Sequence, residues 1–519
     1  MELRPRQVSF VNDVESGWKQ FRKQLGVAPT GCGKTIIFSH LAKRLLDSSG
    51  GKTLILAHRE ELIDQAIDKL HAATGIVAEK EKADFRASKT SPVVVASIQT
   101  MMRRFDSWPA DHFKLVVCDE AHHSLSDSWQ KVLSYFDPHA NILGVTATPD
   151  RGDKRDLGTY YENIAHEISL LDLIREKFLS QITIRSVPLQ IDLSNVSQTA
   201  GDFDSAGLDG ALDPYLEQIA ASIKEYAGGR KILCFLPLIA TSKKFTEICI
   251  FHGINARHID GESEDRKAIL ADFAAGKFEM LNNAMLLTEG YDCPDISCIV
   301  VLRPTRSRPL FAQMVGRGTR IHPQKENLLI LDFLWLHSRL KIVHPASLIS
   351  KSDAEAEEIT KLIEDKSAAM PGDVAELIPI DLCAVASEAA TAREDALRKR
   401  LEAMANRKAK FVSAEEFAIK NHKIAIAEFE PTMKWHSDPM TPKQMEWVEK
   451  AGVNIDTVKG KGHASIILDA YFGNLKNQPA SSKQKWAMRQ AGWVSTDGTR
   501  DAGAATQSEA RIFFAGRNK

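Results

Sequence analysis

The sequence lacks the features that mark secreted, membrane-spanning and zinc-ribbon proteins. Its 7 cysteines are scattered and odd in number, with no C-x-x-C pair, so we expect neither a disulfide framework nor a zinc ribbon. No apolar run approaches the about 18 residues of a membrane helix. The N-terminus has no apolar signal segment. We therefore expect a soluble, cytoplasmic protein with no membrane partner.

The sequence also lacks an excess of charge of either sign. It contains 67 Lys and Arg against 68 Asp and Glu, a net charge of -1. Overall charge therefore does not indicate a polyanionic partner, and any nucleic-acid site must come from a local arrangement of charge. A chain of 519 residues predicts about three to five domains.

Short apolar runs alternate with amphipathic stretches in the first third of the chain. The runs are Leu25–Ala28, Thr53–Ala57, Val93–Ala96, Leu115–Cys118 and Ile142–Val145. Polar and apolar residues do not alternate along these runs, which is typical of strands buried on both faces of a parallel sheet. Thr35–Leu46 and Glu60–His71 between them have helical periodicity. This β-α-β-α order predicts a doubly wound α/β domain over residues 1–185.

A second domain of the same class is predicted further along the chain. Residues 186–215 are rich in Ser, Asp, Gly and Asn, which indicates a linker or insertion. Alternation then resumes, and residues 216–345 are predicted to form the second α/β domain. Its strand-like runs are Lys231–Leu236, Ala256–Ile259, Glu279–Leu287, Cys298–Leu302 and Leu328–Phe333.

The C-terminal third is predicted to be α-helical. Residues 346–430 have helical periodicity at Asp353–Glu364 and Ser387–Lys410, and we interpret them as a helical spacer without strands. Residues 431–519 contain a repeat, because Thr441–Gly452 resembles Ser481–Gly492, and each copy predicts a small helical module. Lys and Arg outnumber Asp and Glu there. Trp447, Trp486 and Trp493 among these basic residues indicate nucleic-acid binding, protein docking or simply a helical core.

The strongest local pattern is Ala28-Pro-Thr-Gly-Cys-Gly-Lys-Thr35, which follows an apolar run and begins a helical one. Glycines allow backbone N–H groups to turn toward phosphates at a helix N-terminus. Lys34 would add a positive charge, and the Thr35 hydroxyl could ligate Mg²⁺. The generic phosphate-loop pattern begins with Gly, whereas this sequence has Ala28. The alternative, an accidental Gly-Lys-Thr turn, does not explain the strand–loop–helix context.

A second pattern, Leu115-Val-Val-Cys-Asp-Glu-Ala-His122, places two carboxylates after a buried run. Nucleotide sites in open α/β sheets lie at such strand ends. Asp119 would hold Mg²⁺, and Glu120 would orient and deprotonate the attacking water. His122 and His123 have no partner with metal spacing nearby, so we do not interpret them as zinc ligands.

Together these segments resemble superfamily 2 helicases of the DEAD/DEAH-box type. Asp119–His122 is similar to the DEAH form of the Walker B motif, and other motifs of this superfamily follow in their expected order. They are Arg4–Gln7 (Q-type), Leu54–Arg59 (Ia), Ala96–Thr100 (Ib), Thr146–Pro149 (III), Phe235 (IV), Leu287–Pro294 (V) and Gln313–Arg320 (VI). The resemblance covers about residues 1–340 and is strongest to bacterial and phage DNA helicases, distantly XPB-like. DEAD-box RNA helicases carry Asp where His122 stands and His where Gln313 stands.

The resemblance implies two tandem RecA-like domains with ATP and Mg²⁺ bound between them. It assigns catalysis to Lys34, Asp119, Glu120, Gln313, Arg317 and Arg320, and metal binding to Thr35 and Asp119. It assigns ATP binding to Arg4, Gln7, Pro29, Thr30, Gly31, Cys32, Gly33, Lys34, Thr35, Gly290 and Asp292. Arg317 and Arg320 would reach the phosphates only when the two domains close, and a planar guanidinium there stabilises transition-state charge. The alternative is that both arginines only form salt bridges.

The same resemblance places Arg59, Gln99, Thr100 and Thr288 against the phosphates of one nucleic-acid strand. Each of them could instead be a helix-capping or turn residue. We predict an ATP-dependent DNA helicase or translocase, with DNA as the partner and a possible protein partner for the C-terminal region. The alternatives are an RNA helicase or remodeller, a nucleotide-gated clamp with slow hydrolysis, and the motor subunit of a restriction-type complex.

Overall fold

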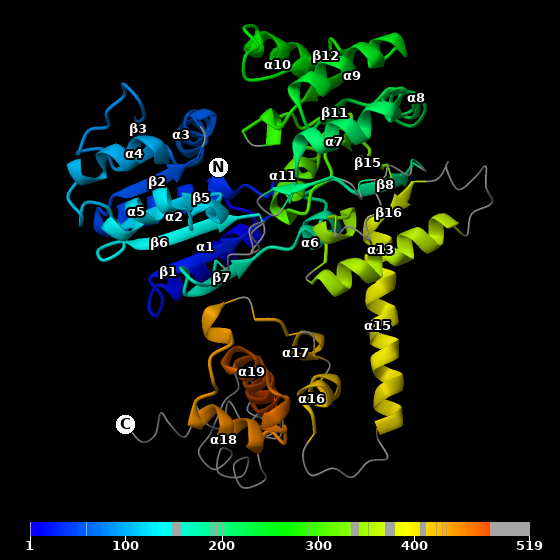
Figure 1. The fold of residues 1–519 in the computed structure, drawn as a ribbon. Coiled ribbons are helices and arrows are strands. Elements are labelled where there is room, and N and C mark those ends of the chain that lie inside the picture. Colours follow the sequence, from blue (N-terminus) through cyan, green and yellow to red (C-terminus); the bar gives the residue numbers. More distant parts are fainter. Residues whose placement is uncertain are drawn as a thin grey trace. The chain divides into compact units, whose positions relative to one another are not determined.

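The chain divides into two units, Met1–Thr391 and Ala392–Lys519. The first unit contains two seven-stranded sheets flanked by helices (Figure 1). This computed structural model describes residues 2–58, 60–147, 157–187, 189, 193, 196–199, 202–288, 290–333, 342–350, 352–368, 379–404, 412–421, 423–427, 429–431 and 433–477. The predicted fold class, two parallel-sheet domains followed by helices, is confirmed. Among the described residues, no helix is both long and apolar enough to cross a membrane.

The first sheet has the order β3-β4-β2-β5-β6-β1-β7, and all its strand pairs are parallel. Its strands are β1 (Lys23–Val27), β2 (Thr53–Ala57), β3 (Glu79–Glu81), β4 (Val93–Ser97), β5 (Leu115–Asp119), β6 (Asn141–Thr146) and β7 (Asn163–Glu167). Its helices are α1 (Pro5–Gly17), α2 (Lys34–Ser49), α3 (Glu60–Thr74), α4 (Ile98–Arg104) and α5 (Asp127–Phe136). Every residue of β2 and β4 is buried, as expected for strands covered on both faces. The edge strands β3 and β7 are partly exposed, and the apolar pattern did not predict them.

The second sheet has the order β12-β13-β11-β14-β15-β8-β16. Its strands are β8 (Ile182–Ser186), β11 (Ile232–Phe235), β12 (Ala256–Ile259), β13 (Met280–Asn283), β14 (Cys298–Val301), β15 (Leu328–Asp332) and β16 (Ile380–Asp381). The covering helices are α8 (Leu216–Ala227), α9 (Ile239–Phe251), α10 (Arg266–Ala274) and α11 (Arg308–Gly316). We expected the first domain to extend to residue 185, but β8 pairs with β15 of the second sheet. The chain therefore leaves the first domain through α6 (Leu170–Arg175), before β8.

Residues 186–215 are not a simple linker. They contain a hairpin of β9 (Gln198–Thr199) and β10 (Asp202–Phe203), followed by α7 (Ser205–Leu212). Phe203, Leu208 and Leu212 are buried in the same apolar cluster as Ile232 of β11. The segment therefore completes the core of the second domain. Its few apolar residues are spread among polar ones, which explains why composition indicated a linker.

Residues 346–430 are likewise more than a helical spacer. They begin with α13 (Asp353–Ala368) and include β16, which pairs antiparallel with β8 at the sheet edge. The next helix is α15 (Leu382–Met404). Ile359 and Ile363 of α13 and Leu382 of α15 lie in the apolar cluster that contains Ile184 of β8. α13 and the first turns of α15 therefore belong to the core of the first unit, and the expectation that residues 346–430 contain no strand was wrong.

The second unit is a small helical module around a core of its own. Its helices are α16 (Ala414–Lys420), α17 (Ile424–Ala427), α18 (Pro442–Lys450) and α19 (Lys461–Asn477). The first predicted repeat copy forms α18, which Thr441 caps by accepting a hydrogen bond from the Gln444 amide, and a turn at Gly452 leads toward α19. The ring of Trp447 lies edge-on to that of Phe472, which favours the interpretation of Trp447 as a residue of the helical core. The second copy, with Trp486 and Trp493, lies outside the described residues.

Candidate active site

The phosphate loop connects β1 to α2, as its sequence context predicted. Gly31 and Gly33 both have a φ of 89°, a left-handed conformation that residues with a side chain rarely adopt. Gly33 is the N-cap residue of α2, and Lys34 and Thr35 form the first turn of this helix. The loop therefore presents backbone amides at the positive end of a helix dipole, an arrangement suited to binding phosphate.

Lys34 lies at the centre of the site, bonded to a carboxylate from the neighbouring strand. Its Nζ donates to Glu120 Oε1 at 3.2 Å, and both side chains are about nine-tenths buried. Burial alone would lower the pKa of the Lys34 ammonium, but attraction from Glu120 and then Asp119 outweighs it and raises the pKa. Lys34 therefore keeps its positive charge at neutral pH. Burial raises the pKa of the adjacent Cys32 thiol to about 11, so Cys32 stays neutral.

Asp119 and Glu120 stand where β5 ends. Asp119 is the last residue of the strand, and its Oδ1 accepts a hydrogen bond from the Glu120 amide at 3.1 Å. Glu120 has a φ of 53°, a left-handed conformation uncommon for a residue with a side chain. Such backbone strain persists where surrounding contacts enforce it, and it clusters at functional sites. Here the turn brings the Glu120 carboxylate onto Lys34 and within 3.5 Å of His122 Nδ1.

The Q-type residues lie against the phosphate loop. Gln7 is buried in the first turns of α1, and its Nε2 donates to the carbonyl of Cys32 at 2.8 Å. The Arg4 amide donates to Gln7 Oε1 at 2.9 Å, which fixes the orientation of the Gln7 side chain. The Arg4 guanidinium lies over the ring of Phe178. The structure therefore connects Arg4 and Gln7 to the loop that would hold ATP, with Phe178 as an aromatic neighbour that the motifs did not predict.

The second domain contacts the phosphate loop through the segment that resembles motif VI. Gly316 ends α11, and a Cβ atom there would come within 2.5 Å of Thr30 Cβ, so only glycine permits this approach. Thr319 Oγ1 donates to the Thr30 carbonyl at 3.3 Å. Gln313 Nε2 lies 3.3 Å from His122 Nε2. The two halves of the predicted site therefore meet within the first unit, as the resemblance implied.

Arg320 lies beside the phosphate loop, with its Cγ in van der Waals contact with the position a Gly31 Cβ would take. Its guanidinium forms an ion pair with Asp292, and Lys69 of α3 approaches the same carboxylate at 3.5 Å. Burial lowers the pKa of Arg320. Burial also lowers the pKa of Lys69, and repulsion from Arg320 and Arg317 lowers it further. Asp292 thus lies between two cations from different domains.

Arg317 is bonded to backbone groups of its own domain in this conformation. Its Nε donates to the carbonyl of Thr288 and its Nη1 to the carbonyl of Tyr291, each at 3.0 Å. Both acceptors belong to the loop that resembles motif V. In this conformation the guanidinium therefore holds that loop in place, and its role at the phosphates of a closed site stays a prediction. The alternative that both arginines form salt bridges fits Arg320, which is paired with Asp292, whereas Arg317 donates to two carbonyl groups.

The four residues predicted to contact nucleic acid do not form one described surface. Thr288 is buried and its hydroxyl donates to the Met285 carbonyl at 3.0 Å, so this conformation does not present it to a phosphate. Gln99 is exposed and donates to the His58 carbonyl at 3.1 Å. Thr100 accepts hydrogen bonds from Ala83 and Ser97 near the start of α4. Arg59 lies outside the described residues, as do Thr148 and Pro149 of the segment that resembles motif III.

Sequence reasoning missed a group of residues at the domain contact. Gln65 donates to the Gly290 carbonyl, and Lys69 one helical turn later approaches Asp292. Their spacing on α3 is the only signal that could have indicated them, because residues four apart share a helix face. Ser180 and Lys325 both bond to carbonyls next to Arg320. Neither belongs to a recognisable pattern.

The described residues fit Mg²⁺ bound with ATP. Thr35 supplies a hydroxyl at the start of α2, and Asp119 supplies a carboxylate at the end of β5. Mg²⁺ keeps several waters and typically takes one or two protein carboxylates together with substrate phosphates, so a dense ligand cluster is not required. Within the described ranges no group of three or more His, Cys, Asp or Glu residues gathers as a metal site. Thr35 and Asp119 are therefore the residues that would hold a magnesium ion bound together with ATP.

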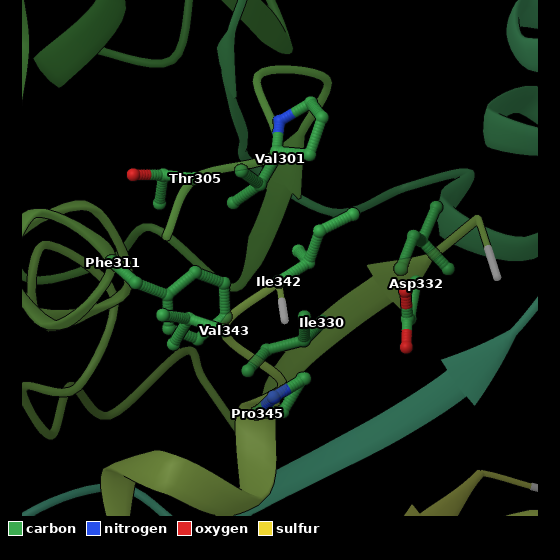
Figure 2. Close-up of a pocket in the computed structure, with 10 residues that line it drawn as sticks. Val301, Thr305, Phe311, Ile330, Asp332, Ile342, Val343 and Pro345 are labelled. Atoms are coloured by element: carbon green, nitrogen blue, oxygen red, sulfur yellow. The ribbon is translucent and has the colours of Figure 1, made fainter. Parts of the chain in front are cut away.

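A separate cavity lies behind the segment that resembles motif VI. Figure 2 shows Phe311 of α11 beside Val301 and Ile330 of the sheet, and Ile342 and Pro345 also line the cavity. Asp332 and Thr305 are its polar neighbours. None of the predicted ATPase residues lines it. Its mostly apolar wall indicates packing between α11 and the sheet.

Comparison with known protein families gives two matches. Residues 1–151 match the family described as "Type III restriction enzyme, res subunit". Residues 214–322 match "Helicase conserved C-terminal domain". The first match covers β1 to β6 and the second covers β11 to β14. They include the phosphate loop, the Asp119–Glu120 strand end and the Gln313–Arg320 segment.

Individual proteins agree with these matches. A Saccharomyces cerevisiae protein named as an ATP-dependent helicase, IRC3, is 32% identical over 402 residues, covering 73% of this chain and 58% of that protein. A 51.5 kDa protein of a Lactococcus phage is 27% identical over 316 residues, covering 60% of this chain and 66% of that one. The chain thus spans less than two thirds of either relative. The solved structure of the ATP-dependent Type ISP restriction-modification enzyme LlaBIII bound to DNA has a TM-score of 0.54 at 14% identity, covering 100% of this chain and 43% of that one. At this identity the likeness concerns the fold alone.

Proposed function

We propose that this chain, which belongs to superfamily 2 of the helicases, is an ATP-driven motor that moves along or unwinds DNA. Members of this superfamily are nucleic-acid-dependent ATPases, and their two sheet domains together form one ATPase site. The observation that carries the proposal is the joint presence of the Lys34–Glu120 pair and Arg320 at one phosphate loop. Each comes from a different element, and Arg320 comes from the second domain.

The roles of the first-domain residues follow from their chemistry. The amides of the Gly31–Thr35 loop and the Lys34 ammonium bind the phosphates of ATP. Glu120 accepts the proton of the attacking water, and its strained backbone holds the carboxylate at the end of β5. Mg²⁺ held by Thr35 and Asp119 would neutralise charge on the phosphates. In this structure the Glu120 carboxylate forms an ion pair with Lys34.

The second domain supplies the remaining positive charge. Arg320 stabilises the negative charge that concentrates on the phosphate in the transition state. To do so it exchanges its ion pair with Asp292 for the phosphate, and Lys69 can then neutralise Asp292 from the first domain. Hydrolysis is thereby coupled to the contact between the domains, and repeated changes in that contact would move the nucleic acid.

DNA is proposed as the track because of the first-domain family match. That family is described by a restriction enzyme subunit, and restriction enzymes act on DNA. His122 and Gln313 also differ from the residues that DEAD-box RNA helicases carry. The same match favours a second candidate, the motor subunit of a restriction-type complex in which a partner provides the nuclease. Both candidates share DNA-stimulated hydrolysis of ATP.

The test is steady-state ATP hydrolysis with no nucleic acid, single-stranded DNA, duplex DNA, branched DNA and RNA, at two salt concentrations. We expect stimulation by DNA that weakens with salt, since phosphate contacts release counterions on binding. We expect no stimulation by RNA. Stimulation by RNA alone would reassign the protein to RNA remodelling. Hydrolysis that no nucleic acid stimulates would contradict the motor.

A further inference from the structure

The backbone carrying Arg320 is held at three consecutive carbonyl groups. Lys325 Nζ donates to the carbonyl of Gly318 and, at 2.9 Å, to the carbonyl of Arg320 itself. The amide of Ser180, in the segment that joins the two sheets, donates to the carbonyl of Thr319 at 2.7 Å. The Thr319 hydroxyl donates to the Thr30 carbonyl of the phosphate loop. This short turn is therefore fixed from both domains.

Lys325 is an unusual residue for such a position, because its ammonium is partly buried and bonds carbonyls in place of a carboxylate. The carboxylate that attracts its charge is that of Asp295, which is itself bonded to Lys231 and to the Cys293 thiol. Burial lowers the pKa of Lys325 to about 7. Asp295 and Cys293 act to raise this pKa, whereas Arg230 and Arg320 act to lower it. Burying an ammonium group costs free energy because the charge loses its hydration. An uncharged side chain could fill the same space without that cost, so packing alone does not explain a lysine here.

We propose that Lys325 is a positioning residue of the ATPase, whose ammonium fixes the backbone on both sides of Thr319 so that Arg320 is held beside the phosphate loop. The inference rests on the function proposed above and adds to it a residue that no motif contains. Lys325 bonds to the backbone of the turn that carries Arg320. It acts through the carbonyls of Gly318 and Arg320, and hence through the direction in which the Arg320 side chain leaves the chain.

Loss of the ammonium would affect turnover more than binding. The carbonyls of Gly318 and Arg320 would lose a charged donor, and hydrogen bonds from charged donors are about twice as strong as neutral ones. The turn would then be free to shift, and a displacement of about 1 Å in a catalytic group can cost about 10²-fold in rate. Lys34 and the loop amides would still bind ATP. We therefore expect kcat to fall about 10- to 100-fold with KM for ATP changed less than about threefold.

The charge on Lys325 gives a second, independent signature. Deprotonation as the pH rises through about 7 would weaken the two hydrogen bonds and lower kcat. The folded pKa lies below the ordinary value of 10.5, so the unfolded chain binds more protons between these two pH values. The Lys325 contribution to stability therefore increases with pH in that window. As the pH rises, kcat is therefore expected to fall while the Lys325 contribution to the free energy of unfolding increases. General unfolding would lower both quantities together.

The experiment uses the full chain and compares wild type, Lys325→Met, Lys325→Arg and the control Lys267→Met, an exposed lysine on α10. For each protein we would measure DNA-stimulated kcat, KM for ATP and the thermal midpoint, across about pH 6.5 to 9. We expect the loss of kcat in Lys325→Met, substantial rescue in Lys325→Arg and no effect in Lys267→Met. Wild type should lose kcat on the alkaline side, and Lys325→Arg should not, because its guanidinium stays charged.

Each other outcome overturns the inference. Unchanged kcat in Lys325→Met, or a matching rise in KM, would show that Lys325 does not position Arg320. If Lys325→Met fails to fold, the pH profiles decide: a wild-type kcat that is flat on the alkaline side, or an alkaline fall that persists in Lys325→Arg, contradicts the inference. If nucleic acid does not stimulate hydrolysis by the wild-type protein, the result contradicts the proposed function. The inference about Lys325 then fails with it, because it rests on that function.

Discussion

The two halves of the candidate site are built in opposite ways. In the first domain, the predicted catalytic side chains stand at the start of α2 and at the end of β5 and are already together, with Lys34 Nζ 3.2 Å from Glu120 Oε1. In the second domain, Arg317 and Arg320 are engaged by their own domain, one with the carbonyls of Thr288 and Tyr291 and the other with Asp292. The first half therefore needs only its substrate, whereas the second half must exchange partners before it can act.

This difference separates two arginines that sequence alone treats as equivalent. Arg320 has a partner that it can exchange, because Asp292 also has Lys69 within 3.5 Å. Arg317 donates to two backbone carbonyls of the loop that resembles motif V, so its release would remove a charged donor from both of these polar groups. We infer that Arg320 performs the chemistry and that Arg317 shapes the loop next to it. The predictions below test this division.

Replacing Arg320 should have the largest effect. Arg320→Ala removes the guanidinium that stabilises the transition state, an effect typically worth about 10³–10⁵ in rate. We expect DNA-stimulated kcat to fall by that order, with ATP binding nearly unchanged. Stopped-flow binding of a fluorescent ATP analogue and steady-state hydrolysis would measure both quantities. Arg44→Ala, an exposed arginine of α2 paired with Glu15, is the matched control and should behave as wild type. A fall of less than tenfold in Arg320→Ala would remove this residue from the mechanism.

Glu120→Gln should come next. The amide cannot accept the proton of the attacking water, and loss of a general base typically costs about 10²–10⁴-fold. ATP binding should persist, because Lys34 and the loop amides are unchanged. Hydrolysis measured in a single turnover isolates the chemical step from product release. Glu217→Gln, on the surface of α8, is the control. An unchanged turnover rate in Glu120→Gln would contradict the role of this carboxylate.

Arg317→Gln should mainly change stability. The variant leaves the Thr288 and Tyr291 carbonyls without a charged donor, and hydrogen bonds to charged groups typically contribute about 1.5–3 kcal/mol each. We expect a lower thermal midpoint than for wild type, while Arg320→Gln keeps the wild-type midpoint and loses turnover. Differential scanning fluorimetry on both variants makes the comparison. Equal midpoints for the two would erase the distinction between the arginines.

Gln7→Ala should have the smallest effect. The change removes the hydrogen bond to the Cys32 carbonyl, and a neutral hydrogen bond contributes about 0.5–1.5 kcal/mol. We expect KM for ATP to rise by about 2- to 12-fold on the usual conversion of free energy, with kcat nearly unchanged. The ratio of ATP to GTP hydrolysis should fall in the variant if Gln7 also reads the base. A reduced kcat at unchanged KM would place Gln7 in the chemistry instead.

The strands that carry the candidate site, and the family, could be predicted because the sequence patterns that indicate them are local. The apolar runs at β1, β2, β4, β5 and β6 are short and fully buried, and the phosphate loop and the Asp119–Glu120 pair lie at their ends. The resemblance to superfamily 2 helicases is likewise confirmed by the family matches. Residue types and spacing along one segment carried this information.

The features that sequence reasoning missed depend on contacts between distant segments. β8 looks like a strand of the first domain but pairs with β15, which follows it by more than a hundred residues. Nothing near Arg317 reveals that its acceptors are the Thr288 and Tyr291 carbonyls. Lys69 and Lys325 lie in ordinary helix and loop sequence, and only the fold brings them to Arg320. Such pairings are set by tertiary packing, which one sequence does not display.

The central claim is that one chain supplies both halves of the site, and mixing inactive variants tests it most directly. Glu120→Gln lacks the first-domain half and Arg320→Ala lacks the second-domain half. We would mix the two proteins in equal amounts with DNA and measure ATP hydrolysis. We predict that the mixture is no more active than the sum of the separate variants. Recovery of a substantial part of wild-type activity would show that the site forms between two chains, and would contradict the account.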